Sequence, residues 1–376
     1  MGYKIAIDMC YYGRVHSGGK DEASYNLLRG FEKNGVGSQV VCFAYREMVE
    51  KLSSICPSMK ICVVPEISTH KIIGSLHIWL RSYYEERWAI RNHVDLLVLP
   101  NKPTANRKFK IKTVEIPHDI SIFEDIIASN LSKRYKSAQK RAITNDFKNR
   151  DHIIAISDYD KNEMIRFFPW AKDKIFRIYD PIRFGNSVSN GAKKYITALN
   201  IQWGHKNVET LIKAFSLIAS HIEYDLIVVG RYPQSIKSLK KLVHENHLED
   251  RVVFTGFVSY EKLNHIIEKT RIYVNASIFE GFGMTAVEMM GRKVPTIVAA
   301  NTAQPEVTMG LCRYYSPAKD HMALAETIME EIKNPRSDAE LESIAKAIRE
   351  KYSYEKIAKE YWEFFERALE ERELQR

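Results

Sequence analysis

Two glutamates eight positions apart flank a glycine-containing turn in the second half of the chain. The stretch runs from Asn275 to Glu288 and reads NASIFEGFGMTAVE. A buried strand is predicted to end near Asn275 and a helix to begin near Gly283, where free N–H groups and the helix dipole attract anions. Glycines let a ligand approach the backbone closely. The carboxylates of Glu280 and Glu288 add acceptors for hydroxyl groups, and Glu288 could bind both hydroxyls of a ribose.

This arrangement has a plain alternative, a surface glutamate pair beside a tight glycine turn. The strand–turn–helix context favours a functional interpretation. One short segment then offers donors for phosphate and acceptors for hydroxyls, and a nucleotide sugar requires both.

Two basic residues are expected at strand ends in the same half. Lys206 lies in His205-Lys206-Asn207, at a turn that opens a predicted helix, Val208–His221. A lysine is a mobile point charge suited to a diphosphate, whereas a surface lysine near a helix start is the plain alternative. Arg231 ends the predicted strand Asp225–Gly230, where ligands bind in parallel sheets. A solvated loop arginine is the alternative there.

The first half offers a histidine and a glycine pair. His118 follows a predicted strand, Thr113–Pro117, with Asp119 beside it. A lone histidine is more often structural, but this one stands at a strand end, where ligands bind. Gly18 and Gly19 precede a predicted helix, Glu22–Asn34, and a tight turn would need the same glycines.

Alternating strands and helices position these residues in two successive runs. Short apolar segments rich in β-branched residues or leucine, each followed by a turn or helix, are typical of parallel sheets. The predicted strands of the first run are Lys4–Asp8, Val40–Ala44, Asp95–Leu99, Thr113–Pro117 and His152–Ile156. Those of the second run are Lys194–Leu199, Asp225–Gly230, Arg251–Thr255, Arg271–Asn275 and Pro295–Ala299.

The sequence therefore predicts an α/β protein of two doubly wound domains with a cleft between them. A segment rich in Pro, Gly, Ser and Asn, residues 181–191, is interpreted as the linker. The predicted domains span residues 1–180 and 192–350. Near the end, a charged helix over Tyr354–Gln375 carries Trp362, Phe364 and Phe365, which need a surface to bury against.

Length and composition restrict the class of protein. A chain of 376 residues is long enough for two domains, and it has no apolar run long enough for a transmembrane helix. The five cysteines are irregularly spaced without a CxxC pair, which favours reduced thiols in a cytoplasmic protein and argues against a cysteine metal site. The net charge of +9 suits phosphate-bearing substrates, an anionic membrane surface or nucleic acid, and a solvated helix face is the plainer explanation.

An aromatic and basic segment, Ile72–His93, bears on the acceptor. It contains Trp79, Tyr83 and Trp88 among arginines. Either it forms an amphipathic surface that touches a bilayer, or it forms one or two helices that face the core. Together with the basic first half, it predicts a peripheral membrane enzyme acting on a lipid-linked or polysaccharide acceptor.

The C-terminal half resembles the family-four retaining glycosyltransferases, glycosyl transferases group 1, which have the GT-B fold. The resemblance is carried by Glu280–Glu288, Met289-Met290, Val294–Ala299, Gln304–Val307 and the upstream Arg251–Val258 with Leu263 and Tyr273. The N-terminal half matches more loosely. The resemblance implies an acceptor-binding N-terminal domain, a nucleotide-sugar-binding C-terminal domain, and a C-terminal helix, residues 354–376, that crosses back onto the N-terminal domain.

The resemblance also implies roles for single residues. Glu288 would hold the ribose, Glu280 and His118 would lie at the transferred sugar, and Lys206 would neutralise the diphosphate. The remaining implied contacts are the sugar and diphosphate at Phe282, Gly283, Met284 and Thr285, the base at Gly256, Phe257 and Val258, and the phosphates at Gly18 and Gly19. The chain departs from the family at Thr285, where relatives have proline, and at Asn200 and Ile201, where relatives carry an arginine. Arg231 is the suggested substitute.

The implied activity is transfer of a hexose from a nucleotide sugar with retention of configuration, in the assembly of cell-surface polysaccharide or glycan. The acceptor would attack from the face that the diphosphate leaves, so no protein nucleophile is needed. No DxD-type metal site is evident, and neither a metal nor another obligatory cofactor is expected. A sugar-nucleotide epimerase and an inactive nucleotide-sugar-binding protein stay as alternatives. The absence of GxGxxG after any predicted strand disfavours a nicotinamide dehydrogenase, and nucleic acid is not expected as a partner.

Overall fold

The computed structural model describes residues 5–10, 18–65, 74–100, 107–118, 120–124, 132–186, 188, 194–199 and 201–373. The chain forms two compact units. Unit 1 comprises Met1–Pro181 and Tyr352–Arg376, and unit 2 comprises Ile182–Lys351. Of the predicted linker, residues 187 and 189–191 lie outside the described part of the chain.

Unit 1 is built on a seven-stranded sheet in which every pairing is parallel. Its order is β3-β2-β1-β4-β5-β6-β7. The strands are β1 (Ile5–Asp8), β2 (Val40–Ala44), β3 (Lys60–Val63), β4 (Leu96–Pro100), β5 (Lys112–Ile116), β6 (His152–Ala155) and β7 (Ile175–Arg177). The helices in the N-terminal part of unit 1 include α1 (Gly19–Lys33), α2 (Val49–Ile55), α3 (Gly74–Arg91), α5 (Lys133–Asn149) and α6 (Asp158–Phe167). The central strands are buried throughout, as expected for a sheet covered on both faces.

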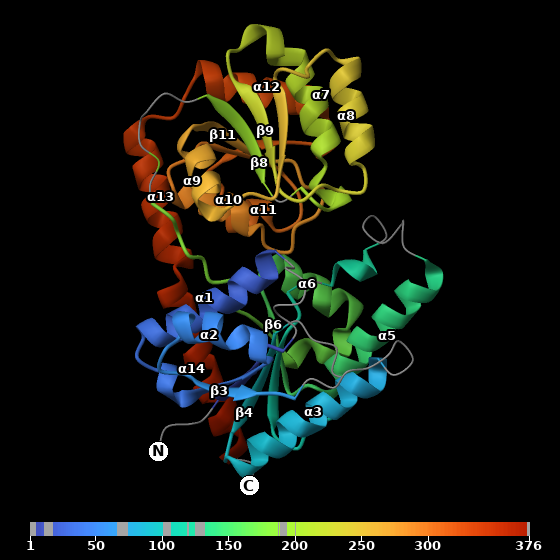
Figure 1. Ribbon diagram of the computed structural model, residues 1–376, viewed down its shortest axis with the longest axis vertical. Helices are drawn as coiled ribbons and strands as arrows, with labels where there is room; N and C mark the ends of the chain where they lie inside the picture. The colour runs from blue at the N-terminus through green and yellow to red at the C-terminus, as the bar shows by residue number, and fades with distance from the viewer. Residues whose placement is uncertain are drawn as a thin grey trace. The chain divides into compact units, whose positions relative to one another are not determined.

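Unit 2 repeats the arrangement with six parallel strands in the order β10-β9-β8-β11-β12-β13. The strands are β8 (Tyr195–Leu199), β9 (Asp225–Val229), β10 (Val252–Gly256), β11 (Thr270–Asn275), β12 (Thr296–Ala299) and β13 (Arg313–Tyr315). The helices are α7 (Val208–Ile218), α8 (Ile236–Glu245), α9 (Tyr260–Glu268), α10 (Met284–Gly291), α11 (Gln304–Val307), α12 (His321–Lys333) and α13 (Asp338–Tyr352). In both units, helices flank the sheet (Figure 1).

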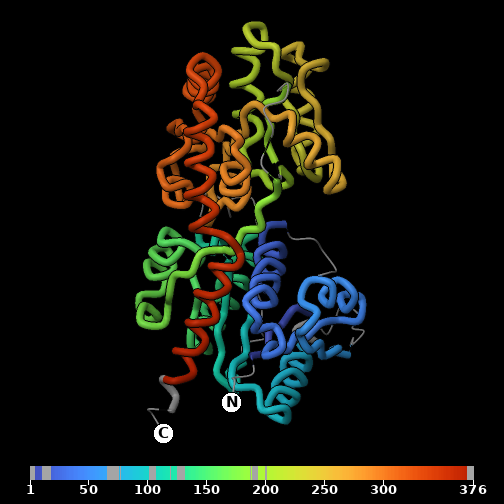
Figure 2. The backbone as a smooth tube through the Cα atoms, turned by 90° about the vertical axis from the view of Figure 1, so that its left-hand side faces the viewer, coloured from blue at the N-terminus to red at the C-terminus, as the bar shows by residue number. Residues whose placement is uncertain are grey.

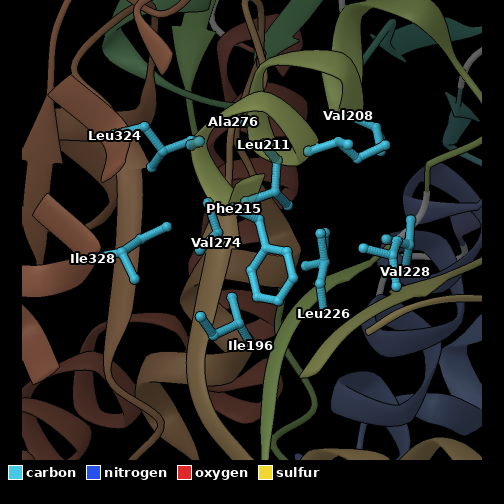
Figure 3. Close-up of a cluster of buried hydrophobic side chains, with 14 of the residues drawn as sticks. Ile196, Val208, Leu211, Phe215, Leu226, Val228, Val274, Ala276, Leu324 and Ile328 are labelled. Atoms are coloured by element: carbon cyan, nitrogen blue, oxygen red, sulfur yellow. The ribbon is translucent and has the colours of Figure 1, made fainter. Parts of the chain in front are cut away.

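The core of unit 2 lies between its sheet and helices α7, α8 and α12. Phe215 of α7 stands at its centre, with Leu226 and Ile196 of the strands beside it and Ile328 of α12 nearby (Figure 3). Each of these side chains is fully buried. Burial of one such side chain contributes about 1.5–3 kcal/mol, so this layer is a main source of stability for the unit.

The C-terminal helix α14 (Tyr354–Glu373) packs along α1 within unit 1 (Figure 2). Phe31 of α1 meets Trp362 edge-on, with ring centroids 5.6 Å apart, and Phe364 packs against Phe176 of β7 at 5.0 Å. The aromatic residues of this helix therefore find their surface on the N-terminal sheet and its first helix.

Three strands were not predicted from the sequence: β3, β7 and β13. Two of them have only three residues, and β3, at an edge of its sheet, has exposed residues at both of its ends. Strands that are so short or so exposed carry no continuous apolar run, and the hydrophobic pattern does not reveal them. The predicted helix Val208–His221 is also shorter than expected, because α7 ends at Ile218 and a 3₁₀ turn follows.

Candidate functional site

The carboxyl edge of the unit 2 sheet holds Lys206 and Glu280, two of the residues predicted to do chemistry. The strand order reverses direction between β8 and β11. In doubly wound sheets the loops on either side of such a reversal diverge and leave room for a ligand. Lys206 lies in the loop after β8, and Glu280 lies in the loop after β11.

An asparagine ties these two loops together. Asn207 adopts a left-handed backbone conformation, with φ 55° and ψ 39°, directly before α7. Its amide donates to the carbonyl oxygens of Ala276 at 3.0 Å and Ala318 at 2.8 Å. The N–H of Ile278 donates to the His205 carbonyl at 2.8 Å. Backbone groups that no regular element satisfies are therefore paired between loops.

Lys206 and Glu280 form an ion pair at the reversal point. The Lys206 Nζ atom lies 2.7 Å from Glu280 Oε1, and Ser277 Oγ donates to the same oxygen at 2.8 Å. Burial acts to raise the pKa of Glu280, but the Lys206 cation and the hydrogen bonds from Lys206 and Ser277 outweigh it and hold the pKa below its ordinary value. The carboxylate is therefore ionised at neutral pH.

The start of α10 is shaped by a glycine. Gly283 is the N-cap of the helix with φ 94°, a conformation that side-chain-bearing residues rarely adopt. The first N–H groups of α10 have no side-chain cap. Phe282 beside it is buried, and Met284 begins the helix. Thr285 accepts a hydrogen bond from Tyr273 Oη at 2.7 Å, so its side chain is oriented from β11. The geometry leaves donors for an anion, as expected.

Glu288 lies on α10 about one turn from its start. Its side chain is 31% exposed, and its Oε1 atom lies 3.9 Å from Arg292 Nη1. Arg292 is itself buried, is held by Asn264 Oδ1 at 2.9 Å, and lines a cavity of about 300 Å³ within unit 2. Glu288 itself does not line that cavity, so its ribose contact stays a prediction.

Arg231 and the residues predicted to contact the base form a group of their own. Gly256 has φ 68° and ends β10, and the exposed Phe257 follows it. The Arg231 guanidinium lies 5.8 Å from the centre of the Phe257 ring, and Val258 is half-buried. Within the described ranges, no contact ties Arg231 to Lys206 or Glu280. Ile201, where relatives carry arginine, is buried in the apolar core, and Asn200 lies outside the described residues.

The remaining predicted residues belong to unit 1. His118 is buried with φ 62°, and its Nδ1 atom lies 3.4 Å from Asp180 Oδ1. Neither ring nitrogen has a hydrogen-bond partner in the described part of the chain. Gly18 caps α1 with φ 84°, and Gly19 is the first, exposed residue of that helix. Asp119 lies outside the described residues.

Several polar residues of the site were not predicted. These are Asn207, Asn275, Ser277, Thr302 and Gln304, and each bonds to the loop that follows β11. Their partners lie in other loops or at short range within a turn, so no spacing rule reveals them. The one available signal is a polar residue at the last position of a buried strand, which fits Asn275.

One group of potential metal ligands occurs among the described residues, and it lies in unit 1. Asp8, Cys10 and Glu85 are all buried there. The Arg81 guanidinium already lies 3.5 Å from Asp8 Oδ2 and 3.3 Å from Glu85 Oε1. The chain thus supplies its own cation to this cluster. None of the three is a predicted site residue.

Residues 182–350 match the family model described as glycosyl transferases group 1. The O-antigen chain mannosyltransferase RfbU of Salmonella typhimurium is 28% identical over 167 residues, which cover 44% of this chain and 47% of that protein. The O-antigen chain mannosyltransferase B of Escherichia coli is 26% identical over 239 residues, covering 59% and 61%. The chain spans about half the length of the curated relatives it matches.

Solved structures are similar over nearly the whole chain. A sucrose-phosphate synthase from Thermosynechococcus elongatus has a TM-score of 0.77 at 18% identity, covering 97% of this chain and 99% of that one. Anabaena HepE in complex with UDP and glucose has a TM-score of 0.73 at 16% identity, covering 97% and 100%. Together with the two parallel sheets and their flanking helices, these likenesses confirm the predicted GT-B fold.

Proposed function

We propose that the chain is a glycosyltransferase, because residues 182–350 match the family model described as glycosyl transferases group 1. It moves a hexose from a nucleotide-sugar donor to a saccharide or lipid-linked saccharide acceptor with retention of configuration. The observation that carries the proposal is the Lys206–Glu280 ion pair at the strand-order reversal, beside the start of α10.

The residues divide the donor between them. Lys206 and the first N–H groups of α10 receive the diphosphate, where preorganised donors stabilise the charge that develops on a leaving group. Glu280 accepts from a hydroxyl of the hexose, and Glu288 accepts from the ribose. Phe257, exposed beside Arg231, offers a face on which a base can stack. The family resemblance also implies donor contacts for His118, Gly18 and Gly19, which belong to unit 1.

The reaction needs no protein nucleophile. The bond between the anomeric carbon and the phosphate oxygen breaks, and an oxocarbenium-like sugar forms. The acceptor oxygen bonds to the anomeric carbon from the same face, and its proton passes to the departing phosphate oxygen. Catalysis rests on stabilising the leaving diphosphate and on positioning the acceptor. The proposal assigns no step to a metal or another cofactor.

The relatives suggest which transferred sugar and which acceptor to test first. Both named relatives are O-antigen chain mannosyltransferases, so mannose is the first hexose to test and a cell-surface polysaccharide the first acceptor. A cytoplasmic location is the natural one for an enzyme that uses nucleotide sugars before export.

Helix α3 supports a contact with a membrane surface. Trp79 and Tyr83 stack with ring centroids 5.5 Å apart, and both side chains are exposed. Leu76 and Ile90 are also exposed, and these positions follow helical spacing along one side of α3. In the described part of the chain, no helix is long and apolar enough to cross a bilayer. We propose that this exposed aromatic side of α3 makes a peripheral contact with an anionic surface.

A donor panel tests the proposal. The protein is incubated with UDP-, GDP-, dTDP- and ADP-sugars, with and without EDTA, and thermal stabilisation and nucleotide release are recorded. One donor should stabilise the fold well above the others, and added acceptor should raise nucleotide release. Binding of a donor without any nucleotide release that depends on an acceptor would favour an epimerase, which converts one nucleotide sugar into another, and no response to any donor would contradict the proposal. Flotation with anionic liposomes tests the membrane contact, which a protein that stays unbound would disprove.

A further inference from the structure

The two oxygens of the Glu280 carboxylate have unequal surroundings. Oε1 receives donors from Lys206 at 2.7 Å, Ser277 at 2.8 Å and Asn275 at 3.3 Å. No described residue donates a hydrogen bond to Oε2. Oε2 is also not one of the fully buried side-chain atoms that lack a hydrogen-bond partner, so it is accessible from outside. One oxygen is thus saturated by the protein and the other is open to a ligand.

The two uncharged donors are held by their own bonds. Ser277 donates its backbone N–H to Asn275 Oδ1 at 3.2 Å, so the side chain of Asn275 closes a tight turn at the end of β11. The carbonyl of Ser277 accepts from Asn301 Nδ2 at 3.2 Å and from Gln304 Nε2 at 3.4 Å. Both Ser277 and Asn275 are buried. Their donor groups therefore have little freedom to leave Glu280.

The backbone of Glu280 is anchored as well. Its N–H donates to Thr302 Oγ1 at 3.1 Å, and its carbonyl accepts from the N–H of Ala303 at 3.3 Å. Thr302 has φ 48°. A side chain whose backbone and one carboxylate oxygen are both held can present its second oxygen in one direction only.

We propose that Asn275 and Ser277 are positioning residues that hold Glu280 Oε1 and present Oε2 to a hydroxyl of the transferred hexose. This inference rests on the proposed function. It assigns the two residues a task that Lys206 cannot perform, because the donor diphosphate competes for the lysine during the reaction. When Lys206 turns to phosphate, the serine and the asparagine still keep the carboxylate in place.

The effect should fall on the sugar and not on the nucleotide. Neither residue belongs to the segments proposed to bind the base, the ribose or the diphosphate. Ser277→Ala should lower kcat by about 10–100-fold, the range expected when a hydrogen bond to a charged group is lost. The Kd of the nucleoside diphosphate that lacks the sugar should stay within about two-fold. Asn275→Ala should have a smaller effect of the same kind, because its bond is longer.

The matched control is Ser259→Ala. Ser259 is exposed and accepts from the Lys262 N–H at 3.3 Å as the N-cap of α9, with no bond to the site. It should keep wild-type kcat. A double-mutant cycle completes the test: in a Glu280→Ala background, Ser277→Ala should cause no further loss of kcat, because a positioning residue acts only through the residue it holds.

The outcomes separate the inference from the proposed function. If wild-type protein turns over a nucleotide sugar and Ser277→Ala matches Ser259→Ala, the inference is wrong. It is equally wrong if Ser277→Ala weakens nucleoside diphosphate binding as much as it lowers kcat, or if its loss adds fully to that of Glu280→Ala. If Ser277→Ala does not fold, Asn275→Ala is subjected to the same comparison. If wild-type protein binds no nucleotide sugar, the proposed function itself fails.

Discussion

Lys206 Nζ lies 2.7 Å from Glu280 Oε1, so the cation proposed to bind a diphosphate is paired with a carboxylate of the same site. Both side chains are largely covered, at 17% and 11% exposure. A donor must exchange this pair for a bond between lysine and phosphate. Lysine–carboxylate and lysine–phosphate hydrogen bonds are both charge-assisted and strong. Exchanging one for the other therefore needs little free energy, whereas removing Lys206 or Glu280 leaves its partner's charge without compensation.

Lys206→Met should lower both activity and stability. Loss of one preorganised donor reduces kcat by about 100–1000-fold. Without its cation, the covered Glu280 carboxylate loses part of its compensation, and the free energy of unfolding at pH 7 should fall by about 1–3 kcal/mol. The control is Lys213→Met, which removes an exposed ion pair with Glu209 and should cost no more than about 0.5 kcal/mol.

The pH dependence of this loss has a defined sign. In the wild type the pKa of Glu280 is lowered, so its contribution to stability is present above the unfolded-state pKa and disappears as the pH falls through the folded-state pKa. The stability gap between wild type and Lys206→Met, measured by urea unfolding, should therefore be widest at neutral pH and narrow in acid. A gap that is constant with pH would mean that Lys206 stabilises the fold by packing alone.

Glu288→Ala should weaken the binding of the donor nucleotide. A carboxylate that accepts from ribose hydroxyls is worth about 10–100-fold in Kd, as measured by calorimetry with the nucleoside diphosphate. A 2′,3′-dideoxynucleotide should bind the wild type more weakly and should bind the variant as well as the ribonucleotide does. Unchanged affinity in the variant would show that the ribose lies elsewhere. Glu326→Ala, at an exposed position on α12, is the control.

A buried pair of carboxylates in unit 1 predicts a second pH effect. Burial, and then the neighbouring Asp146, raise the pKa of Glu115 to about 8, although Arg150 lies 2.9 Å from its Oε2 atom and opposes the shift. A raised carboxyl pKa stabilises the fold below the unfolded-state pKa, and this contribution is lost as the pH rises through the folded-state pKa.

Glu115→Gln replaces the titrating carboxyl group by a neutral amide, which keeps an acceptor oxygen for Arg150. The stability of the variant relative to wild type should therefore rise between about pH 5 and pH 8, with a slope of at most about 1.4 kcal/mol per pH unit. Chemical denaturation at several pH values measures it. Glu326→Gln should show no such rise, and a flat difference for Glu115→Gln would mean that Glu115 is ionised in the folded protein.

Gly30→Ala should destabilise unit 1 against the trend of helix propensity. Alanine favours a helix over glycine by about 0.5–1 kcal/mol. A Cβ atom at Gly30 would lie 2.2 Å from Ala358 Cβ and 2.5 Å from the Tyr354 carbonyl oxygen of α14, so the helices would have to move apart. A net loss of about 1–3 kcal/mol is expected in thermal or urea unfolding. Gly204→Ala, where a Cβ would meet nothing within 4 Å, should be nearly neutral. A stabilised Gly30→Ala would disprove the close packing of α1 and α14.

The sequence alone was sufficient to predict the central strands. It was also sufficient to predict that the segment Glu280–Glu288 contains a turn that leads into a helix. Strands such as β2 and β4 are continuous apolar runs because both faces of the sheet are covered, and that requirement is local. The glycine before α10 was also readable, since a positive φ favours glycine at that position. These features depend on neighbours in the chain, so the order of residues records them.

The tertiary structure alone decided which separate loops meet. Lys206 and Glu280 are 74 positions apart and pair because β8 and β11 are adjacent in the sheet, an order that no local pattern encodes. Asn207, in the loop after β8, and Thr302, in the loop after β12, form hydrogen bonds with the loop after β11 for the same reason. Strands β3, β7 and β13 escaped prediction because they are short and only partly buried, so they carry no long apolar run. A hypothesis about chemistry could thus be drawn from residue types within one segment, whereas the pairing and orientation of its groups follow from strand order.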